Sequence, residues 1–228
     1  EPLPPPRSKH SAVFDPTTRD LVVFGGALAS GGFANDVWRL NLKDMKWAHF
    51  ELEGSPPGRQ GHSAVVDQEK GSMIVFGGLG SGSGPGLEYF NDVWALDLKT
   101  MTWAQLETEG PPSAREGHSA VVDQEKGSMI LFGGAQGGMS GHANDLWALD
   151  LKTLKWAQLE PEGPPPARNS HAAVIDPENQ SMIIFGGVNL NDLWMLDLTA
   201  MQWTQLEAEG PPPPRCNSGV FDQESRSL

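Results

Sequence analysis

Four histidines recur along the chain at nearly regular intervals, and histidine is a side chain that binds metals and moves protons near neutral pH. Each one opens a short apolar run, and they stand at His10, His62, His118 and His171. A repeating fold that brought these imidazoles into a ring could bind a metal ion. Whether they form such a ring depends on the elements that carry them.

Charged side chains recur with the same regularity. One arginine begins each unit, at Arg7, Arg59, Arg115 and Arg168, and one aspartate ends the following apolar run, at Asp15, Asp67, Asp123, Asp176 and Asp222. Glutamate pairs close the units, at Glu51 and Glu53, Glu107 and Glu109, Glu160 and Glu162, and Glu207 and Glu209. Because these positions repeat, we interpret the arginines and aspartates as structural ion pairs and turn caps. The glutamates form either a solvated rim or an acidic binding face.

These side chains are carried by copies of one unit. The stretch GHSAVVDQEKGSMI occurs word for word at 61–74 and again at 117–130. Every unit also contains a Gly-Gly pair, an Asn-Asp pair and two tryptophans nine residues apart. Only the interval from the second glycine to the asparagine changes in length, with values of 9, 13, 10 and 4 residues. The repeats run over 7–58, 59–114, 115–167 and 168–214, with a partial copy at 215–228.

Within a unit, four short segments rich in β-branched and aromatic residues alternate with turn signals. A repeat of about 50 residues with four strands is typical of a β-propeller blade. We therefore expect an all-β fold in which residues 1–228 form one propeller region of four complete blades and the first strand of a fifth. Uncovered blade faces would cost several kcal/mol at ~25 cal/mol per Å². We therefore expect further blades, six or seven in all, or a partner that covers the ends.

The Gly-Gly pair followed by two tryptophans at fixed spacing resembles the kelch repeat. The PPxR-xx-HSAVV opening is similar to the kelch subgroup of fungal cell-end markers and plant acyl-CoA-binding kelch proteins. The resemblance covers residues 4–228. It implies that the recurring histidines are hydrogen-bond partners near a central channel, with the metal site as the alternative. The glycine pairs and tryptophans are then framework, the tryptophans filling the space between blades.

Enzymes that resemble kelch propellers offer two chemistries to compare. Galactose-oxidase-like proteins use a copper site with a Tyr-Cys cross-link, but Tyr89 and Cys216 stand at unrelated repeat positions. Plant nitrile-specifier proteins carry a Glu-x3-Asp-x3-His iron site, and none of the six histidines has an aspartate four residues before it. We therefore expect no enzyme activity, no catalytic residue, no cofactor and no metal. A catalytic propeller of epimerase or metal-dependent type, with active residues outside this sequence, remains the alternative.

Variation confined to one loop per repeat, on a rigid scaffold, is how recognition surfaces are usually arranged. We therefore expect a protein-interaction or scaffold module that binds a partner through these loops. The candidate contacts are Leu28, Phe33, Leu87, Glu88, Gln136, Met139, His142 and Asn189. We expect Leu79 to Glu88 to form the longest of these loops. An architectural subunit that uses blade edges inside a large assembly is the alternative.

The charge limits the class of partner. The 228 residues carry a formal net charge of −13, which repels nucleic acids and anionic membranes and is compatible with a basic protein partner or with solubility alone. The longest apolar runs are too short to span a bilayer. One cysteine, Cys216, excludes an internal disulfide and fits a reducing intracellular compartment. The sequence shows no targeting peptide, which carries little information because no initiator methionine is present.

Overall fold

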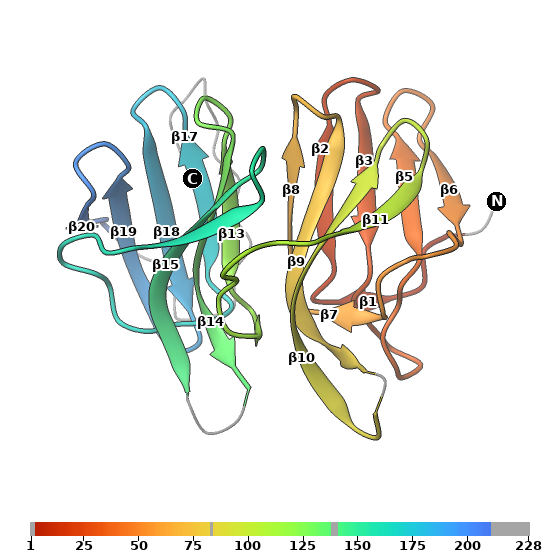
Figure 1. Cartoon of the computed structure of the whole chain (residues 1–228), viewed down its shortest axis with the longest axis horizontal. Coiled ribbons are helices and arrows are strands. Elements are labelled where there is room, and N and C mark those ends of the chain that lie inside the picture. Colours follow the sequence, from red (N-terminus) through yellow and green to blue (C-terminus); the bar gives the residue numbers. More distant parts are fainter. Residues whose placement is uncertain (1–2, 83, 138–140, 211–228) are drawn as a thin grey trace. The chain divides into compact units, whose positions relative to one another are not determined.

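Four antiparallel β-sheets repeat one design along the chain (Figure 1). The computed structural model describes residues 3–82, 84–137 and 141–210, and every regular element in those ranges is a strand. The chain divides into two compact units, Glu1–Glu116 and Gly117–Leu228, and each unit contains two of these four sheets. We call the sheets the first to fourth blades, in chain order.

The first unit contains the first and second blades. The first blade has the strand order β2(Ser11–Asp15), β3(Asp20–Phe24), β5(Val37–Asn41) and β6(Lys46–Phe50), with β1(Arg7–Ser8) paired to β4(Ala27–Leu28). The second blade has the order β8(Ser63–Asp67), β9(Ser72–Ser81), β10(Leu87–Asp97) and β11(Thr102–Leu106), and β7(Arg59–Gln60) also pairs with β9. The last strand of this unit is β12(Arg115–Glu116).

The second unit contains the third and fourth blades. The third has the order β13(Ser119–Asp123), β14(Ser128–Gln136), β15(His142–Asp150) and β16(Lys155–Leu159). The fourth has the order β17(Ala172–Asp176), β18(Ser181–Gly187), β19(Leu190–Asp197) and β20(Gln202–Leu206). The predicted four-stranded meander is therefore confirmed in all four repeats. The predicted first strand of a fifth blade, at 215–228, lies outside the described residues.

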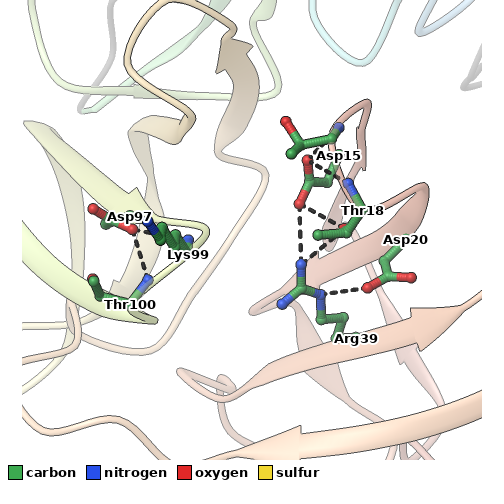
Figure 2. Close-up of polar contacts among 8 residues, drawn as sticks. Asp15, Thr18, Asp20, Arg39, Asp97, Lys99 and Thr100 are labelled. Carbon is green, nitrogen blue, oxygen red and sulfur yellow. Dashed lines mark hydrogen bonds and ion pairs between the residues drawn. The ribbon is translucent and has the colours of Figure 1, made fainter.

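Aspartates hold the tight turns of the blades. The Asp15 carboxylate accepts hydrogen bonds from the Thr18 N–H at 3.4 Å and from the Thr18 hydroxyl at 2.7 Å (Figure 2). At the third turn of the second blade, Asp97 accepts N–H bonds from Lys99 at 2.8 Å and Thr100 at 2.7 Å. Asp67, Asp123 and Asp176 likewise accept the N–H bond of the residue three positions later. The predicted turn caps are therefore confirmed, apart from Asp222, which lies outside the described residues.

The Gly-Gly pairs are required by close backbone approach. Gly25 and Gly26 have φ values of 67° and 100°, which disfavour any residue with a Cβ. A Cβ on Gly25 would stand 2.9 Å from the Arg59 carbonyl oxygen, and one on Gly26 would stand 2.9 Å from the Ser8 carbonyl oxygen. These glycines therefore let neighbouring strands meet, as the framework interpretation predicts.

A continuous apolar core lies between the two blades of each unit. In the first unit, Phe24 of the first blade packs on Trp103 of the second, with ring centroids 4.9 Å apart. In the second unit, Phe132 and Trp203 repeat this contact at 5.1 Å. The second tryptophan of these repeats therefore fills the space between blades, as predicted.

The longest variable segment differs from the expected loop. Leu79 continues β9 and pairs with Tyr89, and Leu87 starts β10 and pairs with Ser81. The two strands therefore extend past the glycine pair as a hairpin. The prediction of a ten-residue loop was wrong, because backbone pairing with the opposite strand extends into glycine-rich sequence that has little strand propensity of its own.

Replacing Phe24 by alanine should lower the free energy of unfolding by about 3–5 kcal/mol, because its fully buried ring fills the space between two blades. Urea unfolding measures this loss. Phe14→Ala is the matched control, since Phe14 is also on a strand of the first blade but is 48% exposed. Equal losses in the two variants would contradict the proposed packing role.

Candidate functional site

Two buried arginines join neighbouring blades within the units. The Arg59 backbone N–H donates to the Ala34 carbonyl at 3.2 Å, and its carbonyl accepts the Gly26 N–H at 2.7 Å, both in the first blade. Its guanidinium instead reaches the second blade, where it donates two hydrogen bonds to Asp92 at 2.6 and 2.9 Å and one to the Gly77 carbonyl at 2.9 Å. One residue therefore bonds to both blades.

The second unit repeats the arrangement. The backbone of Arg168 bonds to Gly134 and Ala143 of the third blade. Its guanidinium donates to Asp192 of the fourth blade at 2.7 and 2.8 Å and to the Gly186 carbonyl at 2.9 Å. Arg7 makes the same side-chain bonds to Asp36 and Gly25. The prediction that the recurring arginines form structural ion pairs is therefore confirmed for Arg7, Arg59 and Arg168, although their partners are not the aspartates of the Asp15 series.

The carboxylate partners of these arginines are the aspartates of the Asn-Asp pairs, which sequence reasoning used only as landmarks. Each also accepts a bond from the tryptophan two residues later, as Trp94 Nε1 donates to Asp92 at 2.6 Å. Burial alone would raise the pKa of Asp92, but the Arg59 hydrogen bonds and charge, together with the Trp94 bond, lower it below its usual value. The constant Asp-x-Trp spacing was the signal that could have found this bond.

The recurring histidines bond to serines of the preceding blade. His62 Nε2 lies 2.8 Å from Ser11 Oγ, and His171 Nε2 lies 2.7 Å from Ser119 Oγ. Burial, with a smaller effect from the nearby arginine charge, lowers the pKa of both imidazoles to about 3. The interpretation of the recurring histidines as hydrogen-bond partners is therefore confirmed for His62 and His171. Across residues 3–82, 84–137 and 141–210, no three His, Cys, Asp or Glu side chains form a group that could hold a metal ion.

Arg39 forms an ion-pair cluster specific to the first blade. It stands where the other repeats have Ala95, Ala148 and Met195. Its guanidinium lies 3.0 Å from an Asp15 oxygen and 2.8 Å from an Asp20 oxygen, and it also bonds to the Thr18 hydroxyl (Figure 2). Because the arginine side chain is 17% exposed and both carboxylates are nearly buried, we interpret this cluster as structural.

The variable segments lie beside the connections to the next blade. In the second blade, Asn91 Nδ2 donates to the Pro112 carbonyl at 3.3 Å, and in the third, Asn144 Nδ2 donates to Pro165 at 3.4 Å. These bonds attach the connection to the start of the third strand, where the variable segment ends. In these two repeats the variable segment and the connection to the next blade therefore lie at the same end of the blade.

The first blade contains a pocket of about 580 Å³ at this end. Two of the candidate contacts, Leu28 and Phe33, line it together with the acidic pair Glu51 and Glu53. Ala34, Asn35, Asp36, His49, Leu52 and Ser55 complete the lining. The structure thus brings part of the variable segment and part of the acidic set into one site.

The other candidate contacts lie outside this pocket. Leu87 is 64% exposed at the start of β10, and Glu88 beside it is exposed as well. Gln136 ends β14, His142 starts β15, and Asn189 occupies the turn before β19 with a φ of 63°. Met139 lies outside the described residues.

Four-stranded antiparallel blades packed through a buried interface are the architecture of a β-propeller. The structure of YjhT has this fold in common with the chain, with a TM-score of 0.71 at 21% identity over 92% of this chain and 68% of that one. The KLHDC2/KLHL20/DRC7 Kelch-repeats domain matches residues 1–166, and the chain belongs to the kelch-repeat family.

Two sequence relatives support this assignment. Host cell factor 2 of Homo sapiens is 33% identical over 204 residues, which cover 81% of this chain and 25% of that protein. An F-box/kelch-repeat protein of Arabidopsis thaliana is 32% identical over 217 residues, covering 82% of this chain and 44% of that protein. The chain therefore spans less than half the length of either relative. The described residues contain no helix that is long and apolar enough to span a membrane.

Replacing Asp192 by alanine should destabilise the second unit by about 3–5 kcal/mol, because it leaves the buried Arg168 guanidinium without its carboxylate. The double variant Arg168→Met with Asp192→Leu should recover much of that loss, because it removes the charge too. Lys126→Met is the surface control, since its ion pair with Asp123 involves a 54% exposed lysine and should change stability by less than about 1 kcal/mol. A double variant as unstable as Asp192→Ala would refute the buried-charge explanation.

Stability should also fall as the pH drops from about 6.5 toward 3, because the unfolded chain protonates His62 and His171 before the folded chain does. Above pH 6.5 both states hold neutral imidazoles, and this dependence disappears. Urea midpoints measured between pH 5 and 7.5 separate the effect from the aspartates, whose ordinary pKa is 3.8 and is lowered at Asp92. The variant His62→Gln with His171→Gln should have a shallower pH dependence, and an unchanged slope would count against this origin.

Proposed function

We propose that the chain is a protein-binding module that contacts its partner through the variable segments between the second and third strands of the blades. The observation that carries the proposal is a division of roles. The recurring Arg, Asp, His and Trp side chains make bonds within and between blades, whereas the variable segments place side chains such as Leu87 in solvent. Exposed side chains on segments of variable length, carried by a rigid framework, are typical of a binding surface.

The relatives support the same class of function. Host cell factor 2 and the F-box/kelch-repeat protein bear names that denote no catalytic activity. In the described part of this chain, recurring histidines and aspartates that could have acted as acids, bases or metal ligands are hydrogen-bonded in the framework, at His62, His171, Asp92 and Asp192. We therefore favour a non-enzymatic module, with a basic protein as the partner that best complements a net charge of −13.

Replacing Leu87 by serine and Glu88 by lysine should abolish most partner capture and leave the unfolding midpoint unchanged, because both side chains are exposed at the end of a hairpin. The measurement compares proteins retained by the immobilised wild type and by the variant, quantified by mass spectrometry. A thermal or urea melt checks the fold.

The control variant is Glu69→Lys, in the turn between β8 and β9. Because consecutive turns of a meander lie at opposite ends of the shared strand, this turn is at the other end of β9 from the β9–β10 hairpin (Figure 1). The control reproduces the charge change at that end. If Glu69→Lys abolishes capture and the Leu87 and Glu88 variant does not, the partner binds elsewhere and the proposal is wrong.

A further inference from the structure

The pocket of the first blade has apolar and acidic walls that the proposed binding function does not by itself explain. Its volume of about 580 Å³ lies within the range of about 300–1,000 Å³ that is usual for small-molecule sites. Leu28, Phe33 and Leu52 supply the apolar wall, and Glu51 and Glu53 supply exposed carboxylates. Such a lining suits a side chain that combines a long apolar stem with a cationic end.

The polar groups of the pocket differ in whether they are already neutralised. Asp36 accepts both guanidinium bonds of Arg7, at 2.7 and 3.0 Å, and a Trp38 bond at 2.7 Å, so its charge is compensated. Within the described residues, neither Glu51 nor Glu53 forms a hydrogen bond or ion pair through its side chain. Two carboxylates that line the pocket therefore remain uncompensated.

An imidazole forms part of the same wall. His49 stacks on Trp38 with ring centroids 4.3 Å apart and planes inclined by 19°, and its Nε2 lies 3.4 Å from Asp36. The stack holds the ring in place, with the side chain 31% exposed. A flat, fixed ring beside carboxylates is a surface on which a planar guanidinium can stack.

Comparison with the other repeats shows that this wall is local to the first blade. The position of His49 holds glutamine in the other repeats, at Gln105, Gln158 and Gln205. The position of Leu52 holds Thr108, Pro161 and Ala208. The glutamate pair is present in every repeat, so an acidic rim alone does not distinguish this blade. His49 and Leu52 do distinguish it, because the other repeats have different residues at these two positions.

We infer that this pocket binds an arginine side chain presented by an extended segment of the partner protein, with Glu51 and Glu53 pairing the guanidinium and His49 and Phe33 contacting its plane and stem. The inference rests on the proposed protein-binding function and specifies the partner's chemistry. Arginine fits better than lysine because its planar fork can pair with a carboxylate and stack on a ring at once.

The test uses three acetylated, amidated six-residue peptides that differ only at the third residue, which is arginine, lysine or glutamate and is followed by leucine. NMR titration of the whole chain follows the Trp38 indole N–H and the His49 ring. The arginine peptide should shift both signals, the lysine peptide should bind several-fold more weakly, and the glutamate peptide should leave them unchanged. Raising the salt concentration should weaken binding, because the carboxylates are exposed.

The variant Glu51→Gln with Glu53→Gln should weaken the arginine peptide about tenfold. The matched control Glu160→Gln with Glu162→Gln makes the same change at the same repeat positions of the third blade and should have no effect. Absence of shifts with the arginine peptide, equal binding of the glutamate peptide, or equal effects of the two variants would each overturn the inference. Partner capture that depends on Leu87 and Glu88 but not on Glu51 and Glu53 would retain the proposed function and reject this pocket.

Discussion

The junction between neighbouring blades depends on a buried guanidinium. Arg59 bonds through its backbone to one blade and through its side chain to the next, and Arg168 does the same in the second unit. A buried charge is tolerated only when its hydrogen-bond donors are satisfied, and a bidentate carboxylate with a glycine carbonyl satisfies them here. The same junction requires a glycine at Gly25, because a Cβ there would stand too close to the Arg59 carbonyl oxygen.

This construction separates residues that hold the fold from residues free to vary. The imidazole of His62, the carboxylate of Asp92 and the indole of Trp94 are all occupied by bonds at the blade junction. Because those bonds form at one fixed register, the segment between the second and third strands can change length without disturbing them. In the second blade it becomes a hairpin that ends in the exposed Leu87.

The first blade shows how a few substitutions change a repeated framework. The Arg7–Asp36 and Trp38–Asp36 bonds match the Arg59–Asp92 and Trp94–Asp92 bonds of the second blade, so the two blades share these framework bonds. Histidine in place of glutamine at His49 then stacks on Trp38 and forms one wall of the pocket. The first blade therefore combines the shared framework bonds with a pocket-lining histidine that the other repeats do not have at this position.

The sequence by itself determined the blade count of the described chain, the strand order and the framework role of the repeated glycines and tryptophans. These follow from local periodicity and from recurrence at constant spacing, and both patterns are visible in the linear sequence. It did not determine that Asp92 neutralises Arg59, that β9 and β10 extend to Ser81 and Leu87, or that Phe33 and His49 line one pocket. Only the tertiary structure decided these, because each depends on pairing or cavity shape between segments that are distant along the chain or lie on different strands.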